Sequence, residues 1–212
     1  MAWEKRHDIL NEIYENSENN RIHGRLSEGY DYSIKQGALD EPDILVMGDK
    51  VWNPATLLLH GDYSLLPRLE CLLGVQIKLI HAIRNPFDVI ATMHFRSKAP
   101  IPDRIRWYFM HCDAACAIYD HCQDTHYINV YHEKLVSSPD TTITEICTFI
   151  EADAHVYPIE ATKSVLFDKP KQTRFNLAWD KKDIEEVVSR MSRYDFLQKY
   201  AAEDYSGLSA SA

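Results

Sequence analysis

Residues 78–92, with the sequence KLIHAIRNPFDVIAT, carry the clearest secondary-structure signals of the chain. Its first half is an apolar run with a β-branched bias, typical of a buried parallel strand, and we expect a strand over 76–84. Asn85 is a good N-cap residue and Pro86 suits the first position of a helix, so a helix over 86–97 should follow at once. The stretch therefore predicts a strand that ends in a basic residue and turns directly into a helix.

The junction between this strand and this helix is a candidate anion site. At the start of a helix, N–H groups without helical partners and the positive end of the dipole attract negative charge. Arg84 lies beside these groups, Asp88 has a carboxylate that can face them, and Thr92 offers a hydroxyl on the flank of the same helix. The alternative is an ordinary strand–helix junction with a surface arginine.

Size and charge narrow the class of protein. The chain has 212 residues, of which 45% are hydrophobic and 26% charged, enough for one globular domain with a sizeable core. The net charge of −9 disfavours broad nucleic-acid binding, although one local basic pocket stays open. No run approaches the roughly 18 apolar residues that span a bilayer, and residues 1–8 lack the apolar core of a signal peptide. We therefore expect a soluble, cytoplasmic protein without a membrane span.

The cysteines favour a buried helix face over a disulfide scaffold or a metal site. Their odd number and unpaired spacing argue against disulfides. Histidines and cysteines over 111–122 suggest a metal, but tyrosine, alanine and cysteine recur there at steps of three and four, as on a buried helix face. The histidines fall off that face, so we expect no metal. The five cysteines are Cys71, Cys112, Cys116, Cys122 and Cys147.

Three apolar runs alternate with helical patterns along the chain. The runs cover 44–47, 76–84 and 126–131 and predict strands. Helices are expected at 3–16, 55–59, 64–73, 86–97, 103–122, 138–151 and 181–193. This alternation predicts an α/β fold with a parallel sheet, in one domain over 1–200 with a flexible polar tail over 201–212.

Three polar residues lie at the predicted carboxyl ends of the strands: Lys50, Arg84 and Tyr131. In parallel α/β sheets, ligands bind at this edge. Their common position strengthens the interpretation of the junction as an anion site.

Residues 83–92 resemble the 3'-phosphate-binding signature of the sulfotransferase family, whose members use 3'-phosphoadenylyl sulfate (PAPS). In that signature an arginine ends a strand and a serine or threonine follows eight residues later on the helix. Arg84 and Thr92 have this spacing. The resemblance implies that both contact the 3'-phosphate of the donor.

Two further segments follow in the family's order. Residues 131–135 are similar to the family's Tyr-Glu-Asp-Leu segment, whose tyrosine lies near the adenine, and Tyr131 alone carries over. Residues 167–174 resemble the basic segment that closes on the 3'-phosphate, with Lys171 and Arg174 as candidate contacts.

The resemblance also implies a fold and an activity. The fold would be P-loop nucleoside-triphosphate-hydrolase-like, with three layers around a central, mainly parallel sheet. The activity would be sulfuryl transfer from PAPS to an acceptor hydroxyl or amine, with release of adenosine 3',5'-bisphosphate and without a metal. Residues 48–50 are similar to a Gly-Asp-Lys turn in which Lys50 would face the sulfuryl group as the catalytic residue; a solvated turn lysine is the alternative. Carbohydrate, lipid, small-alcohol and protein-tyrosine acceptors all stay open, and no general base is assigned.

One departure separates the chain from the family pattern. The family's first strand normally ends in a Pro-x-Ser-Gly-Thr-like loop for the 5'-phosphosulfate, and none of the seven glycines lies in such a loop. We expect an N-terminally truncated fold, either a fragment or a derived form that lacks the loop. A second hypothesis follows, a catalytically impaired or non-catalytic binding protein that retains only the 3'-phosphate half of the donor site.

Two other expectations complete the set. An ATP-dependent kinase or ATPase is disfavoured because no Gly-x-x-x-x-Gly-Lys-Ser/Thr segment occurs. A missing first strand would expose a sheet edge or an apolar groove, which predicts marginal stability or self-association.

Overall fold

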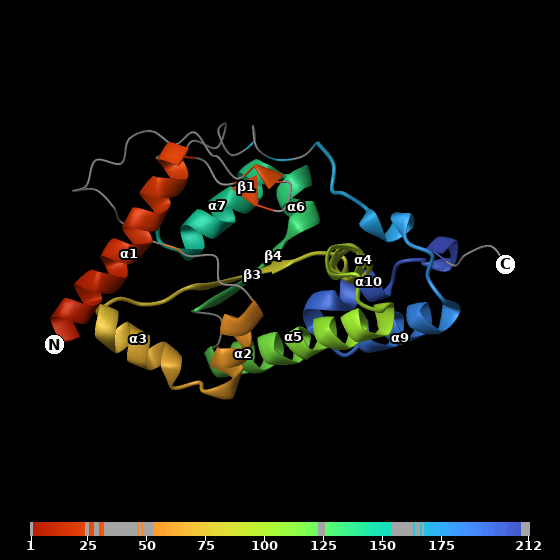
Figure 1. Cartoon of the computed structure of the whole chain (residues 1–212), viewed down its shortest axis with the longest axis horizontal. Coiled ribbons are helices and arrows are strands. Elements are labelled where there is room, and N and C mark those ends of the chain that lie inside the picture. Colours follow the sequence, from red (N-terminus) through yellow and green to blue (C-terminus); the bar gives the residue numbers. More distant parts are fainter. Residues whose placement is uncertain are drawn as a thin grey trace.

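Two parallel strands, β3 (Leu79–Ile83) and β4 (Tyr127–Tyr131), lie at the centre of the molecule (Figure 1). They belong to a computed structural model that describes residues 2–23, 26–27, 30–31, 46, 48, 53–122, 126–153, 163, 166 and 168–208. Both strands were expected from their apolar runs, and both are confirmed. The expected burial of β3 is wrong, because only Ile83 of this strand is buried and Ile80 is 47% exposed.

The register of the two strands brings their carboxyl ends together. Ile83 pairs with Tyr131, so the next residues, Arg84 and His132, leave the sheet from adjacent positions. This edge is where the sequence predicts the ligand site.

Helices make up most of the remaining described structure. The α-helices are α1 (Ala2–His23), α2 (Asn53–Gly61), α3 (Leu65–Leu73), α4 (Pro86–Ser97), α5 (Ile101–Cys122), α6 (His132–Ser137), α7 (Pro139–Phe149), α9 (Lys181–Met191) and α10 (Gln198–Ala201). Shorter elements are the antiparallel pair β1 (Leu26–Ser27) and β2 (Tyr30–Asp31) and the 3₁₀-helices η2 (Thr173–Asn176), η3 (Asp195–Leu197) and η4 (Ser206–Leu208).

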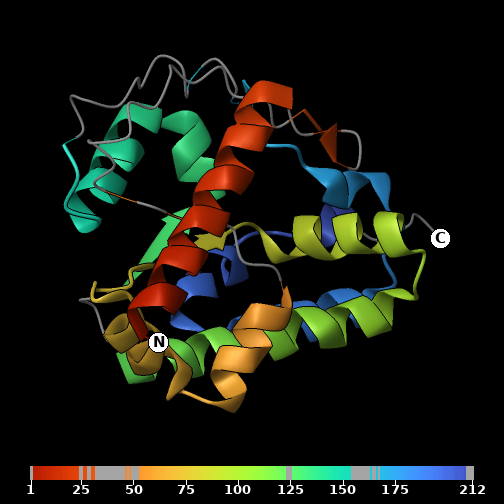
Figure 2. The same ribbon diagram turned by 60° about the vertical axis from the view of Figure 1, so that its left-hand side comes forward.

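The helices gather around the strand pair. Helices α5 and α9 lie on one side of the strands and α6 and α7 on the other, and α2 runs along α5 (Figures 1 and 2). Helix α4 packs against α5, α9 and η2. The fold is therefore mainly helical with a small parallel sheet, an α/β arrangement.

The described sheet is narrower than the sequence predicts. Of the expected strand at 44–47, only Val46 is described; it is in no strand, and 36% of its surface is exposed. The other residues of that run lie outside the described part of the chain. The broad sheet, the three layers and the P-loop-like topology remain predictions.

Helix α4 begins as its sequence predicts. The Asn85 side chain accepts a hydrogen bond from the Phe87 N–H at 3.0 Å, and Pro86 occupies the first helical position. Phe87, Ile90 and Ala91 are fully buried. Each large apolar side chain buried in this way contributes about 1.5–3 kcal/mol, which fixes α4 against the core.

The cysteine-rich face of α5 is part of the core, as predicted. Cys112 and Ala115 are buried, and Tyr108 and Cys116 pack against the same cluster. Burial raises the pKa of the Cys112 thiol to about 12, so this side chain is an inert apolar group. Within the described residues, no three histidine, cysteine, aspartate or glutamate side chains are grouped as metal ligands.

The packed domain ends later in the sequence than residue 200, where its end was predicted. Tyr205 and Leu208 are each only 5% exposed and belong to the main core cluster. The packed structure therefore extends to residue 208, and residues 209–212 lie outside the described part. Among the described helices, none is long and apolar enough to cross a bilayer.

Candidate functional site

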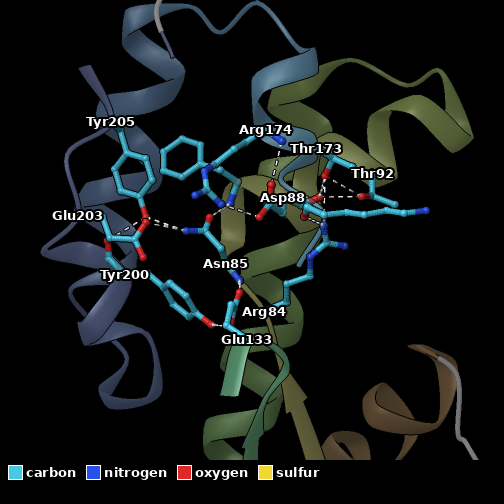
Figure 3. A network of polar contacts seen from close by, with 12 residues as sticks. Arg84, Asn85, Asp88, Thr92, Glu133, Thr173, Arg174, Tyr200, Glu203 and Tyr205 are labelled. Carbon is cyan, nitrogen blue, oxygen red and sulfur yellow. Dashed lines mark hydrogen bonds and ion pairs between the residues drawn. The ribbon is translucent and has the colours of Figure 1, made fainter. Parts of the chain in front are cut away.

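The candidate site lies where the carboxyl end of β3 meets a segment from late in the chain (Figure 3). We call residues 84–88, between β3 and α4, the junction, and residues 168–176 the basic segment. The basic segment includes η2, which packs along α4.

Arg84 connects the junction to the basic segment. Its Nη2 donates to the carbonyl oxygen of Lys171 and lies 3.5 Å from Thr173 Oγ1. Its Nε is buried and has no hydrogen-bond partner within the described chain. A buried N–H without a partner carries a desolvation cost of about 1–3 kcal/mol, so a ligand acceptor at this atom would offset that cost.

Thr173 joins the same cluster and was not predicted. Its hydroxyl donates to the Asp88 carbonyl oxygen at 2.8 Å and lies 3.1 Å from Thr92 Oγ1. Thr92 donates to the same carbonyl at 2.7 Å. Because each hydroxyl has a single proton, Thr92 can donate to an anion only by releasing this carbonyl.

Arg174 and Asp88 form a buried ion pair. Arg174 Nη1 lies 2.6 Å from Asp88 Oδ2, and the Arg174 backbone N–H donates to Oδ1 at 2.9 Å. The two side chains are 12% and 3% exposed. Removing one partner from such a pair typically costs 3–5 kcal/mol, so this contact fixes the basic segment to α4.

The expectation of free N–H groups at the start of α4 is wrong. The Phe87 N–H is bound by the Asn85 side chain, and the Asp88 N–H donates to the Asn85 carbonyl at 3.0 Å. The Asn85 N–H donates to Glu133 Oε1 at 3.0 Å. Pro86 has no N–H. The Asp88 carboxylate faces Arg174 rather than its own helix, so any anion binds through side chains.

Asn85 also connects the junction to the C-terminal segment. Its Nδ2 donates to Glu203 Oε2 and to the Tyr205 hydroxyl, each at 3.1 Å (Figure 3). Glu133 accepts from the Tyr200 hydroxyl at 2.5 Å. Burial opposes ionisation of Glu133, but hydrogen bonds from Tyr200 and Asn85 outweigh it and lower its pKa. Both Nδ2 protons are used, so this side of the junction is fully bonded.

The Tyr131 side chain contacts protein groups through both its hydroxyl and its ring. Its hydroxyl donates to the Phe196 carbonyl oxygen at 3.2 Å, and Lys199 Nζ lies 3.6 Å from the centre of its ring. An adenine that stacked on this ring would have to displace the lysine.

His132 follows β4 and is half-buried. Its Nδ1 is buried without a hydrogen-bond partner in the described structure. Burial and, after it, the nearby Arg84 guanidinium lower the pKa of the ring.

The structure thus gathers four of the six predicted site residues. Arg84, Thr92, Lys171 and Arg174 meet at one place, although Lys171 takes part through its backbone carbonyl. Lys50 lies outside the described residues. His81 in β3 is half-buried, and its Nδ1 is bonded to Asn129 Oδ1 at 2.9 Å.

Thr173 and His132 were missed for different reasons. Thr173 stands in a polar segment, and nothing local distinguishes it. His132 directly follows a predicted strand end, and this position is the signal in the sequence that identifies it.

Comparison with protein-family models, curated proteins and solved structures found no match to this chain.

Proposed function

We propose that the chain is a sulfotransferase-family protein that binds PAPS and transfers its sulfuryl group to an acceptor hydroxyl or amine. The proposal includes the P-loop-like, three-layer fold. The supporting observation is the meeting of Arg84 and Thr92, which have the signature spacing, with the basic segment about 80 residues later. The resemblance calls for this convergence, and local sequence does not require it.

Under this proposal, the site binds the end of the donor that does not react. The Arg84 guanidinium binds the 3'-phosphate, which suits its planar donor set. Arg174 acts indirectly, since its charge is balanced by Asp88. Lys171 contributes the carbonyl that orients Arg84.

The chemical step would rest on positioning and charge stabilisation. The acceptor oxygen or nitrogen forms a bond to sulfur in line with the breaking bond between sulfur and the 5'-phosphate oxygen. The acceptor proton passes to solvent or a base, and adenosine 3',5'-bisphosphate leaves. Lys50 would stabilise charge on the bridging oxygen, by analogy with phosphoryl transfer.

Calorimetric titration with adenosine 3',5'-bisphosphate and with ATP tests the binding half. We expect wild type to prefer the bisphosphate and Arg84→Ala to bind it about 10- to 100-fold more weakly, because a charge-assisted hydrogen bond contributes about 1.5–3 kcal/mol. Arg104→Ala is the matched control, since Arg104 Nε is also buried without a partner. Equal affinities of the two variants, or no binding by wild type, would contradict the proposal.

The second candidate is a non-catalytic protein that keeps only the 3'-phosphate half of the site. The absence of a Ser-Gly-Thr segment from the printed sequence favours it. Incubation with PAPS labelled in the sulfuryl group and a panel of phenol, alcohol, amine and oligosaccharide acceptors separates the two. Binding without label transfer assigns the second candidate.

A further inference from the structure

Two buried nitrogen atoms at the carboxyl ends of β3 and β4 lack hydrogen-bond partners among the described residues. They are Arg84 Nε and His132 Nδ1. Since Ile83 pairs with Tyr131, both residues leave adjacent strands at the same edge. Native structures rarely leave such groups unsatisfied, so one acceptor group bound between them would remove both costs.

We propose that His132 is a second phosphate contact in this site, with its imidazolium Nδ1–H donating to the anion that Arg84 binds. The identity of the phosphate rests on the proposed function, whereas the pairing of His132 with Arg84 does not. The Tyr-Glu-Asp-Leu segment that residues 131–135 resemble has glutamate after the tyrosine, whereas this chain has His132 there.

The surrounding charges couple phosphate binding to protonation of His132. Burial lowers the pKa of the His132 ring most, and Arg84 at the end of β3 lowers it further; Glu133 on α6 and Asp88 on α4 act in the opposite direction. The pKa lies below the ordinary 6.5, so the ring is neutral at pH 7 without ligand. A phosphate dianion offsets both effects that disfavour the charged ring. The site therefore takes up a proton together with its ligand.

Calorimetry of the full chain with adenosine 3',5'-bisphosphate measures this coupling. Titrations in two buffers of different ionisation enthalpy at pH 7 give the protons taken up on binding. His132→Asn keeps an N–H donor near the position of Nδ1 but does not titrate. The phosphate's own titration is present in both proteins and cancels in the comparison.

We expect wild type to take up more protons than His132→Asn. As the pH falls from 8 to 5.5, its affinity should rise relative to the variant by about tenfold for each pKa unit that binding adds to His132. His111→Asn is the matched control, because His111 on α5 also has a buried, unpartnered ring nitrogen, Nε2; it should behave as wild type.

Nitrogen NMR of the wild-type imidazole rings gives a readout that does not depend on a variant folding. The pKa of His132 should rise when the bisphosphate is added. An unchanged pKa, or equal proton uptake by wild type and His132→Asn, overturns the proposal.

Inorganic phosphate as a second probe separates this proposal from the donor assignment. Phosphate binding that depends on His132, without preference for the bisphosphate, supports the histidine contact and contradicts the PAPS assignment. Bisphosphate binding that depends on Arg84 but not on His132 supports the PAPS assignment and contradicts the histidine contact. Absence of binding by either probe overturns both.

Discussion

The two sides of the junction differ in how completely their buried polar atoms are bonded. On the C-terminal side, Asn85 uses both Nδ2 protons, and Glu133 and Tyr205 also have partners. On the side of the basic segment, Arg84 Nε and His132 Nδ1 have none within the described residues. Buried polar groups with full bonding stabilise a fold, whereas two unsatisfied groups at the same edge of a sheet can be satisfied together by one ligand. Substitutions should therefore cost stability on the first side and ligand affinity at the two unpartnered nitrogens.

The ion pair between Asp88 and Arg174, which joins the junction to the basic segment, should give the largest effect. Asp88→Ala leaves the Arg174 guanidinium buried without its carboxylate, and we expect a loss of about 3–5 kcal/mol in the free energy of unfolding. Urea denaturation followed by circular dichroism measures it. Asp103→Ala is the control, because its pair with Arg106 is exposed and should contribute at most about 0.5 kcal/mol. Similar losses in both variants would mean that the buried pair has no special role.

Asn85→Ala should come second. It removes the N-cap of α4 and the bonds to Glu203 and Tyr205. Loss of a cap alone costs about 1 kcal/mol, and the unpaired partners add to it, so we expect about 2–3 kcal/mol. Denaturation of Asn85→Asp separates the two contributions, since aspartate keeps the cap but cannot donate. A fully stable Asn85→Asp would show that the bonds to the C-terminal segment contribute nothing.

Thr173→Val should cost about 1 kcal/mol of stability, the net value of a hydrogen bond whose acceptor retains another donor. The Asp88 carbonyl keeps Thr92 as a partner. The change should also remove the contact of the Thr92 hydroxyl with Thr173 and the contact of Arg84 Nη2 with Thr173, so that Arg84 is held less firmly. Denaturation and bisphosphate titration on the same protein compare the two effects; unchanged ligand binding would place Thr173 outside the site.

His132→Phe should have the smallest effect on stability at pH 7, and at low pH the variant should be more stable than wild type. In wild type the folded-state pKa of His132 lies below 6.5, so the folded state binds fewer protons than the unfolded state below that pH. Wild-type stability should therefore fall as the pH drops through 6.5 toward the folded pKa, and the variant should lack this contribution. At pH 7 the two should agree within about 0.5 kcal/mol, because removal of the unpaired nitrogen stabilises the variant while the larger phenylalanine ring strains the packing. Denaturation between pH 5 and 8 checks both points.

Local sequence predicts the local features of the fold well. Asn85 and Pro86 mark the start of α4, and Gly74 ends α3 in the left-handed conformation at φ 67°. The two apolar runs give β3 and β4 because β-branched residues suit extended backbone, although only Ile83 of β3 is buried. These features depend on residues only a few positions apart.

Contacts between distant residues account for what could not be predicted. The Asp88 carboxylate was expected to face its own helix, and it binds Arg174 instead, 86 positions later. The expected flexible tail contains Tyr205, whose hydroxyl accepts a hydrogen bond from Asn85 and whose ring centroid lies 4.2 Å from that of Phe87. Its neighbours in sequence are small and polar, so the local pattern does not predict that it is buried. The basic segment was recognised by its resemblance, and its pairing with α4 follows from tertiary packing alone.

The spacing of the bonds to Asn85 has a consequence for protein synthesis. Its partners Glu203 and Tyr205 are 118 and 120 residues away in sequence. While residues 203 and 205 are still inside the ribosome, the part of the chain that has emerged can form β3, α4 and β4. Both Asn85 Nδ2 protons then remain without these acceptors. Domains fold as their segments emerge, so this buried site closes only after residues 203–205 have left the ribosome. Any pause before residue 203 would leave the junction open to water and to chaperones.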